Sequence, residues 1–494
     1  MEGSMDPTRI PVIVGAGQAI ERSEIVSAVE LAARAAGAAF DDAPGLRERI
    51  DRLSLVAITF SPAGNAPASE LAKRLGLVDV ACEVTTAGGN MPQWLVNRAA
   101  DDIASGRLGA TLIAGAEATR SMRAEDPDAN FMRAANGSDE AGPKDAVVGP
   151  AITGMVNEAE IHARFFVPGE VYALLEAANA HAAGRDFEAQ RKFLGPMMSH
   201  LSQVASRNPF AWFPREHKPE EISAVTSDNR LIAEPYAKRM NSFPNVDQAS
   251  AVVVTSLAIA RDAGLEERCV FVWSGATVSE SPVSARPDLA DSPAVRKAAA
   301  AALASAGIAA ADLAFIDLYS CFPIAVQMGA RALGIALDDP RGLTITGGMP
   351  FFGGPGNNYS GHAIADMLGR LREESGLGYV AANGGFLSKH SIGIYGATPP
   401  PSGFELSDTR VQQAEVEAAA VPTTLEAEGG AEVVAATVVY DRNGSVASAP
   451  IVANLDDGRR VVAQAAPSVL DGMAGKSLIG ERVRVSGTPL IYEI

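Results

Sequence analysis

The chain has 494 residues, roughly enough for two to four domains, and its 47% hydrophobic and 20% charged residues are typical of a globular protein. A net charge of −18 disfavours binding to nucleic acid, because neutralising phosphates requires a basic face. Hydrophobic runs fall short of the roughly eighteen residues that a membrane span needs. Three widely spaced cysteines and the absence of a signal-like start predict a cytoplasmic location.

The first part of the chain, residues 1–118, alternates short apolar runs with alanine-rich helical patterns. Strands are predicted at 11–16, 53–60, 81–86 and 110–118, and helices at 23–39, 69–75 and 92–105. This alternation is typical of a layered α/β domain. We therefore interpret residues 1–118 as the first half of an α/β core.

The alternation breaks in residues 119–245, which contain polar loops and a predicted helix pair at about 170–183 and 187–207. We interpret this region as a helical insertion. A β-branched run then returns within 246–268, which is predicted to complete the first half.

Residues 269–404 repeat the order of the first half. A helix at 292–306, an Ala-Gly pair, an acidic link and a strand at 313–319 echo the helix at 23–39 and the strand at 53–60. The echo predicts two similar βαβ halves with a site between them. Beyond them, residues 405–494 alternate β-branched runs with Asp-Gly turns, which predicts a small barrel-like β domain.

Two glycine-rich segments stand close together in the second half. Residues 347–361 contain six glycines and precede His362, and residues 383–396 contain a Gly-Gly pair and His390. Glycine permits positive φ and lets backbone amides approach a ligand closely. Together with Cys321, these segments predict the walls of an active site, with ordinary turns as the alternative.

Several ordered segments resemble the thiolase superfamily, in particular the thiolase-like proteins of type 1 with an added C-terminal domain, related to the sterol-carrier-protein thiolases. Residues 228–240 resemble the end of that family's loop domain, 319–322 lie where relatives carry His-Asp-Cys-Phe, and 347–355 lie where they carry a Gly-His-Pro loop. The resemblance implies a five-layer αβαβα thiolase fold. It also implies coenzyme A or an acyl-CoA as ligand, with no permanently bound cofactor.

The catalytic positions depart from the family pattern. A thiolase needs a nucleophilic cysteine at the start of a buried helix, with acid and base groups beside it. Gly89, or Thr86 in a gapped alignment, stands at that cysteine's position. Gly354 replaces the histidine of Gly-His-Pro, and Ala382 or Asn383 replaces the cysteine of the last loop. Thiolysis through an acyl-cysteine at this position is therefore not expected.

Five residues remain as catalytic candidates. Cys321 matches the acid/base cysteine of sterol-carrier-type relatives, with a buried apolar role as the alternative. Tyr319 takes the oxyanion-hole position and could donate a hydrogen bond to a thioester oxygen. His362 could replace the missing histidine or cap a helix, and His390 lies beside the second glycine segment. The amide of Gly385 is a natural oxyanion donor.

The resemblance places the coenzyme A groove along the loop domain. Arg230, Lys238 and Arg239 are candidate phosphate contacts there, and Lys389 is another, because charged side chains form strong hydrogen bonds to phosphate. A solvated basic face is the alternative for each. The histidines lack metal-ligand spacing, so no metal is expected. A homodimer is left open, although the 405–494 domain could block its interface.

Three functions stay open. The first is an acyltransferase-like enzyme that makes or breaks a C–C bond next to a thioester carbonyl, using Cys321 or a histidine for proton transfer. The second is an aldol lyase on a β-hydroxyacyl-CoA, using Tyr319 and Tyr359, in which 405–494 supplies in cis the barrel that such aldolases take from a partner protein. The third is a non-catalytic protein that binds acyl-CoA or lipid.

Overall fold

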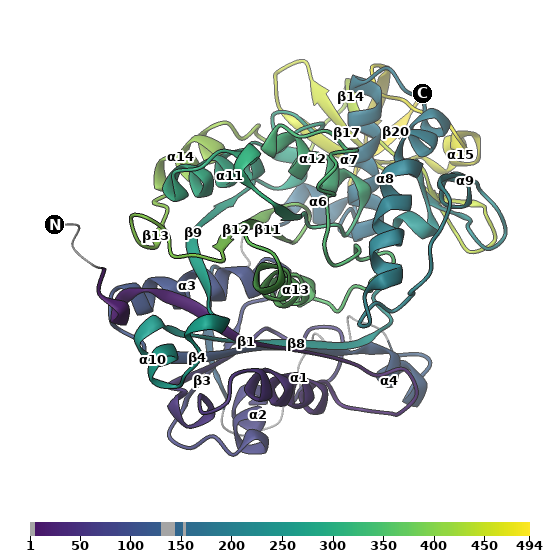
Figure 1. The fold of residues 1–494 in the computed structure, drawn as a ribbon. Helices are drawn as coiled ribbons and strands as arrows, with labels where there is room; N and C mark the ends of the chain where they lie inside the picture. The colour runs from purple at the N-terminus through teal and green to yellow at the C-terminus, as the bar shows by residue number, and fades with distance from the viewer. Residues whose placement is uncertain (1–4, 130–143, 152–154) are drawn as a thin grey trace.

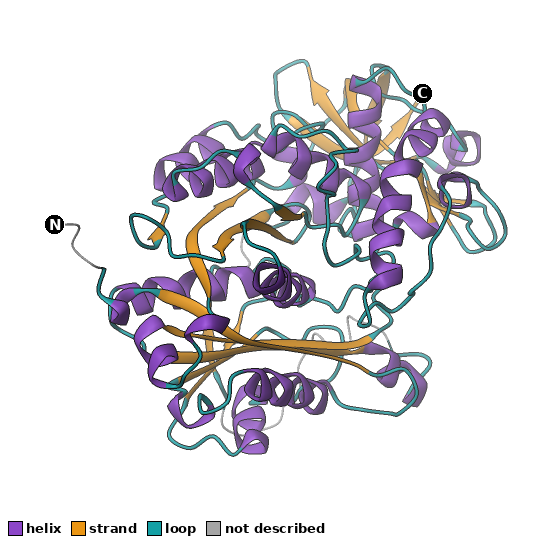
Figure 2. Ribbon diagram, viewed as in Figure 1, coloured by secondary structure: helices purple, strands orange, loops and turns teal. Residues whose placement is uncertain are grey.

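A computed structural model describes residues 5–129, 144–151 and 155–494 (Figure 1, Figure 2). Most strands of the α/β core join one continuous mixed sheet in the order β10-β11-β12-β9-β1-β8-β4-β2-β3-β5. The first half contributes β1 (Pro11–Ile20), β2 (Arg52–Leu55), β3 (Ala81–Thr85), β4 (Ala110–Ala118) and β8 (Asp247–Ser256). The predicted strands are therefore present, although the second ends five residues earlier than expected.

The second half contributes the strands on the other side of β1. They are β9 (Val270–Ser279), β10 (Phe315–Asp317), β11 (Leu377–Gly384) and β12 (Lys389–Gly396). Strand β9 runs antiparallel to both β12 and β1, and the pairs Val12↔Phe271 and Ile13↔Val270 connect the two halves. Much of the second glycine-rich segment, 383–396, is consequently a buried strand rather than a loop.

Helices form three layers around this sheet (Figure 1). One outer layer contains α1 (Ala28–Asp42) and α2 (Pro67–Leu75), and the other contains α11 (Pro293–Ala306) and α12 (Pro323–Leu333). Between the halves lie α3 (Met91–Ala104) and α13 (Tyr359–Glu373), whose apolar residues form one core cluster with those of both parts of the sheet. The five-layer αβαβα prediction is confirmed.

The insertion is mostly helical, as predicted. It contains α4 (Thr119–Glu125), α6 (Glu158–His162), α7 (Pro168–Ala182), α8 (Phe187–Arg207), α9 (Pro219–Ser223) and the short strands β6 (Leu231–Ala233) and β7 (Tyr236–Ala237). One segment inside it, β5 (Ala146–Val148), pairs with β3 in the sheet of the first half. Residues 130–143 and 152–154 of the predicted insertion lie outside the described residues. After β8 the chain continues through α10 (Leu257–Asp262).

The C-terminal region ends in a closed barrel of order β14-β17-β18-β20-β19. These strands are β14 (Gly429–Ala436), β17 (Ile451–Leu455), β18 (Arg460–Ala465), β19 (Arg482–Ser486) and β20 (Ile491–Glu493), with α15 (Pro467–Leu470) between β18 and β19. Buried side chains such as Val433, Ile451 and Val485 form its core. The predicted barrel is confirmed.

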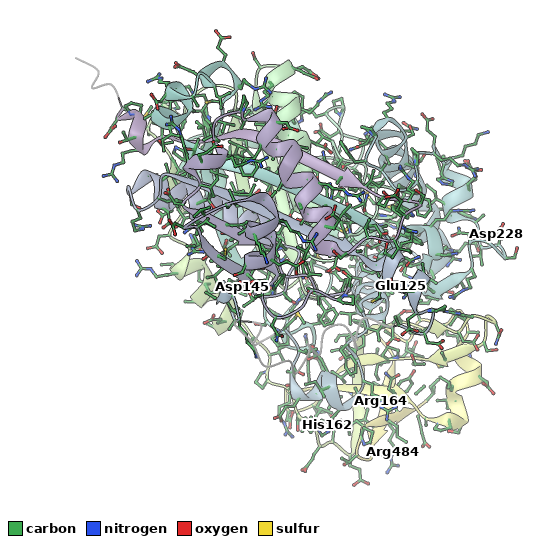
Figure 3. All side chains as sticks on the ribbon, turned by 90° about the horizontal axis from the view of Figure 1, so that it is seen from below. Glu125, Asp145, His162, Arg164, Asp228 and Arg484 are labelled. Carbon is green, nitrogen blue, oxygen red and sulfur yellow. The ribbon has the colours of Figure 1, made fainter. Side chains whose placement is uncertain are left out.

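Two parts of residues 405–494 pack on preceding regions of the chain instead of joining the barrel: one on the α/β core and one on the insertion. Strand β13 (Glu405–Leu406) pairs with β9, and α14 (Arg410–Ala418) packs on α11 and β9. The hairpin of β15 (Val439–Tyr440) and β16 (Val446–Ser448) pairs with β6 of the insertion. The barrel thus lies against the helical insertion (Figure 3).

Candidate active site

The space beside Gly89 is filled by the side chain of Tyr319. Gly89 directly precedes Asn90, the N-cap of α3. A Cβ built on Gly89 would collide with the hydroxyl oxygen of Tyr319, and it would lie 2.5 Å from the carbonyl oxygen of Asn383. Three segments that are far apart in the chain therefore meet here. The gapped alternative is engaged elsewhere, because the Thr86 hydroxyl donates to the carbonyl of Pro150 at 2.9 Å.

The Tyr319 hydroxyl is an uncommitted polar group at this meeting point, where the buried side-chain oxygens of Asn90 and Asn383 also lack a hydrogen-bond partner within the described residues. Within the described residues it forms no hydrogen bond, although the side chain is 8% exposed. Burial, together with the nearby Cys321 thiol, raises the pKa of Tyr319 well above its ordinary value. The side chain is thus a neutral phenol that can donate one hydrogen bond.

Cys321 lies beside two further polar side chains. The Asn383 amide nitrogen donates to the Tyr172 hydroxyl at 2.8 Å and lies 3.9 Å from the Cys321 sulfur. Burial raises the pKa of Cys321 to about 12, although nearby polar groups, including the Phe322 backbone and the Asn383 side chain, act in the opposite direction. A thiol with so high a pKa is protonated at neutral pH, which suits a proton donor better than a base.

Tyr172 was not foreseen from the sequence. It comes from α7 of the helical insertion, its hydroxyl donates to the Gly385 carbonyl at 3.0 Å, and it accepts from the Leu387 amide at 2.8 Å. Its ring stacks on Phe322 with centroids 4.4 Å apart. An aromatic residue on a helix is usually a core residue, so nothing in the local pattern indicates that this one reaches the second glycine segment.

The turn at 384–388 brings the second glycine segment onto the start of α3. A Cβ on Gly384 would lie 3.0 Å from the Gly88 Cα, so both glycines permit this close backbone approach. Gly385 adopts φ +68°. Lys389, predicted as a phosphate contact, is buried, and its Nζ donates to the Ala87 carbonyl at 2.6 Å. Burial lowers the pKa of Lys389.

The two candidate histidines occupy different places. His390 lies behind the turn and bonds the Leu387 carbonyl through Nε2 at 3.2 Å. His362 belongs to α13 and bonds Gln18 of β1 through Nδ1 at 2.6 Å. Burial lowers the pKa of His362 to about 3, and burial together with the Arg286 charge lowers that of His390 to about 3. Both are neutral, and only His390 lies at the turn.

The first glycine segment passes on the other side of Cys321. A Cβ on Gly354, the position of the family's histidine, would collide with the Ser242 hydroxyl, and the Ser242 amide donates to the Cys321 carbonyl at 3.0 Å. The Tyr359 hydroxyl, 0% exposed, accepts from the Gly348 amide at 3.1 Å. Tyr359 is therefore occupied in holding the loop.

The predicted phosphate contacts on the insertion share no hydrogen bond with this cluster among the described residues. Arg230 donates to the carbonyls of Leu231 and Asp441, and Arg239 donates to that of Glu221. Lys238 is exposed. These three residues are close in sequence at the β6–β7 hairpin, and their role with phosphate stays a prediction.

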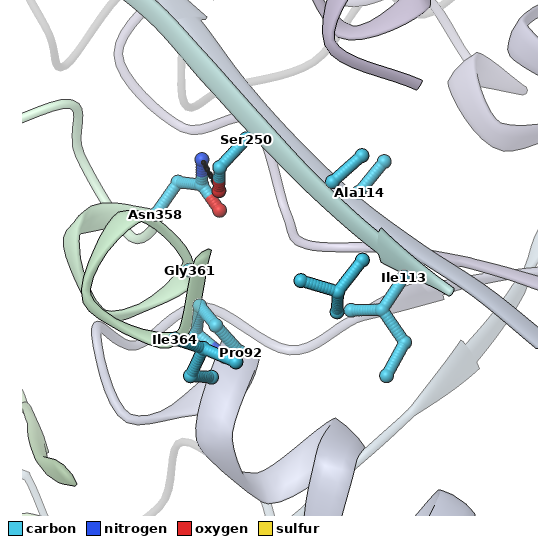
Figure 4. Close-up of a pocket in the computed structure, with 9 residues that line it drawn as sticks. Pro92, Ile113, Ala114, Ser250, Asn358, Gly361 and Ile364 are labelled. Carbon is cyan, nitrogen blue, oxygen red and sulfur yellow. Dashed lines mark hydrogen bonds between the residues drawn. The ribbon is translucent and has the colours of Figure 1, made fainter. Parts of the chain in front are cut away.

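Two cavities in the described part of the chain lie away from this cluster. One, drawn in Figure 4, lies between α3, α13 and the sheet; its volume of about 10 Å³ is only about large enough for one water. The other, of about 450 Å³, is an open depression between α2 and the start of β3, lined by residues that include Lys73, Asp79 and Cys82. Among the described residues, no group of three His, Cys, Asp or Glu side chains could hold a metal ion, and no helix is long and apolar enough to cross a membrane.

Comparison with solved structures identifies the family. A crystal structure of a monomeric SCP2-thiolase-like protein type 1 (STLP1) from Mycobacterium smegmatis is 32% identical, has a TM-score of 0.85, and covers 99% of this chain and 100% of that chain. This chain belongs to the SCP2-thiolase-like protein type 1 family. The family model "Thiolase C-terminal domain-like" also matches residues 275–354. The resemblance to thiolases is thus confirmed over the whole chain.

A second solved structure shares the fold. It is described as an Ltp2-ChsH2(DUF35) aldolase, is 20% identical, has a TM-score of 0.59, and covers 78% of this chain and 98% of that chain. At this identity the match shows the fold alone. A search of curated proteins gave no significant match.

Proposed function

We propose that this SCP2-thiolase-like protein binds an acyl-CoA thioester beside Tyr319, Cys321 and Asn383 and acts on the C–C bond next to its carbonyl without an acyl-enzyme. Membership of the thiolase superfamily supports an acyl-CoA ligand. The observation that carries the rest is the Tyr319 hydroxyl standing where a Cβ of residue 89 would be. A donor at this position can polarise a thioester oxygen but cannot accept an acyl group as a thiolate would.

Aldol cleavage of a β-hydroxyacyl-CoA fits this arrangement best. Water accepts the β-hydroxyl proton, the Cα–Cβ bond breaks to release a carbonyl compound, and the electron pair of that bond forms the enolate of the remaining thioester. Tyr319 donates a hydrogen bond to the enolate oxygen, and the Cys321 thiol protonates the α-carbon. The proton released from the β-hydroxyl then restores the thiol, so protons and electrons balance.

A non-catalytic acyl-CoA-binding protein is the second candidate. It is favoured by the burial of the cluster, which raises the pKa of Tyr319, Cys321 and Tyr172 and lowers that of His390, so that each group favours its neutral form. This cluster contains good hydrogen-bond donors, and none of the four groups is a strong base. A binder needs only the donors.

Three experiments separate these functions. Wild-type protein is incubated with a β-hydroxyacyl-CoA, and separately with acetoacetyl-CoA plus CoA, to measure turnover. In a third experiment, calorimetry measures the binding of acetyl-CoA. Aldol cleavage predicts release of an aldehyde or ketone from the first substrate, which falls about 10²-fold in Tyr319→Phe. Tyr379→Phe is the matched control, because Tyr379 is buried and its hydroxyl has no partner within the described residues.

The other outcomes decide against aldol cleavage. Binding of acetyl-CoA without turnover of either substrate supports the non-catalytic binder. Turnover of acetoacetyl-CoA that disappears in Cys321→Ala supports the acyltransferase. Absence of binding to any coenzyme A ester contradicts all three functions.

Assembly and location remain predictions. The solved relative from Mycobacterium smegmatis is titled as monomeric, whereas a homodimer was left open for this chain. Light scattering decides between a monomer of 51.1 kDa and a dimer. A cytoplasmic location is proposed from composition alone and is tested by cell fractionation.

A further inference from the structure

A fully buried arginine holds the turn that shapes the candidate site. Arg286 is 0% exposed, and its Nη2 donates to the Phe386 carbonyl at 2.7 Å and to the Ser388 hydroxyl at 3.3 Å. Its Nε donates to the Ser281 carbonyl at 3.0 Å. Burial lowers the pKa of Arg286, and the carboxylates of Glu280 and Glu160 act in the opposite direction.

The same turn positions two polar groups beside Cys321. The Leu387 amide and the Gly385 carbonyl both hydrogen-bond the Tyr172 hydroxyl, which in turn accepts from Asn383. Leu387 holds φ +55°, a conformation that a non-glycine residue adopts only when its surroundings impose it. Displacing the turn would therefore move Tyr172 and Asn383 away from Cys321.

A second arginine, from the C-terminal barrel, holds the backbone of the first. Arg460 in β18 is 5% exposed. Its Nη1 donates to the carbonyls of Ser284 and Arg286, and its Nη2 donates to that of Pro287 at 3.0 Å. Its Nε donates to Asn454 of β17 at 2.8 Å, which fixes the guanidinium to the barrel wall. One rigid planar group thus binds three carbonyls within residues 284–287.

We propose that the barrel is part of the site's scaffold, in which Arg460 and Arg286 act in series as positioning residues for the 384–388 turn. The inference concerns the same site as the proposed function and rests on it only for the ligand readout. The barrel interior is filled by apolar side chains. The proposal gives a role to Arg460, a buried charged residue of β18 that instead contacts the backbone of Arg286. The barrel contributes through its outer wall.

Hydrogen exchange of the full-length protein tests this inference without a substrate. In Arg460→Lys, the amine cannot reach all three carbonyls, so amides of a peptide covering 384–389 should exchange about tenfold faster, as expected for losing charged hydrogen bonds. Peptides from β1 and β8 should be unchanged. Arg482→Lys is the matched control, since Arg482 lies on the same barrel and pairs only with Asp456 on the surface.

A double variant tests whether the two arginines act in series. Arg286→Lys alone should accelerate exchange of the turn at least as strongly, and adding Arg460→Lys should add little, because the second arginine acts through the first. Fully additive effects would contradict a series arrangement. An unchanged turn in Arg460→Lys, or equal acceleration across all peptides, would overturn the proposal.

Measuring the affinity for acetyl-CoA tests whether the pair Arg460 and Arg286, called the brace below, affects ligand binding at the site. If acetyl-CoA binds the wild type, its affinity should fall in Arg460→Lys but not in Arg482→Lys. If the wild type binds no coenzyme A ester, the proposed function fails, and the exchange experiment still decides the role of Arg460. Faster exchange of the turn with unchanged affinity would show that the brace does not serve this site.

Discussion

At the scale of single residues, Gly89 and Tyr319 depend on each other. The space that a side chain at 89 would need is taken by the phenol of Tyr319. Reintroducing a side chain at 89 therefore requires the phenol to move. A glycine at 89 and a tyrosine at 319 therefore go together, because a larger side chain at 89 and the Tyr319 phenol cannot occupy the same space.

Gly89→Ala should lower the free energy of unfolding by about 1–3 kcal/mol, because the new methyl group overpacks the site. Tyr319→Phe should restore part of this loss by removing the colliding oxygen. Gly37→Ala is the control: Gly37 lies in α1 with open space around it, so the change should stabilise by roughly 0.5–1 kcal/mol. Denaturant titration measures all three, and a neutral Gly89→Ala would contradict the geometry.

Cys321 should resist reagents that attack thiolates. Burial raises the pKa of Cys321 to about 12, whereas Cys82 is only half-buried. With iodoacetamide at mildly alkaline pH, we expect Cys82 to be labelled first, because both access and thiolate content control the rate. Peptide mass spectrometry follows the labelling. Preferential labelling of Cys321 would mean that its thiol is activated, and the acid role proposed here would be wrong.

The sequence suggested several residues of the candidate site but not how they are held. Gly89, Tyr319 and Cys321 could be found because they stand at aligned family positions, and the structure brings all three together. Tyr172 and Arg286 could not be found, because a buried tyrosine on a helix and an arginine in a loop take their meaning from partners about a hundred to two hundred residues away.

At the scale of elements, α13 carries a buried histidine that links it to β1. His362 is 0% exposed and donates through Nδ1 to the Gln18 side chain, which itself donates to Asp366 at 2.6 Å. The helix therefore holds a neutral imidazole in its interior face. Such a group makes folding sensitive to acid.

The direction in which stability changes with pH follows from the pKa of His362 in the folded and the unfolded chain. Its pKa is about 3 when folded and about 6.5 when unfolded, so below pH 6.5 the unfolded chain binds more protons and stability falls as pH decreases towards 3. His362→Gln, which can still donate to Gln18, should lose less stability than the wild type between pH 7 and pH 4. Denaturant titrations at several pH values measure this. Exposed His181→Gln is the control, and parallel curves for wild type and His362→Gln would refute the argument.

The elements themselves were largely predictable, with one informative exception. Alanine-rich periodicity gave the helices α1, α3 and α11 to within a few residues at most ends. The segment 383–396 was misinterpreted, because its glycines suggested a loop. In β12 they serve packing: a Cβ on Gly393 would collide with Gln93 of α3, and one on Gly396 with Trp273 of β9. Close approach by a distant side chain leaves no local pattern.

At the scale of the whole molecule, the barrel and the α/β core share apolar contacts. Ala435, Val452 and Val462 of the barrel belong to the large core cluster that also contains residues of α1, α7 and α12. The polar contacts of Arg460 and the pairing of β15 with β6 add to this interface. The added domain is therefore integrated with the rest of the fold.

Differential scanning calorimetry of the full chain should show one cooperative transition, because unfolding the barrel alone would expose part of the shared core. Val452→Ala should shift that single peak to lower temperature, since it removes buried methyl groups at the shared face. The surface variant Arg482→Lys should leave the peak in place. Two separated peaks would mean that the barrel unfolds independently.

Arg460 belongs to the same chain as residues 284–287, whose carbonyls it binds, so dilution of the protein cannot separate the two. A clamp supplied by a separate subunit dissociates when its concentration falls below the dissociation constant. Here the linker of β13 and α14 sets the effective concentration of the clamp, which is independent of how much protein is present. Each molecule therefore keeps its clamp closed even at the low copy number of a weakly expressed protein.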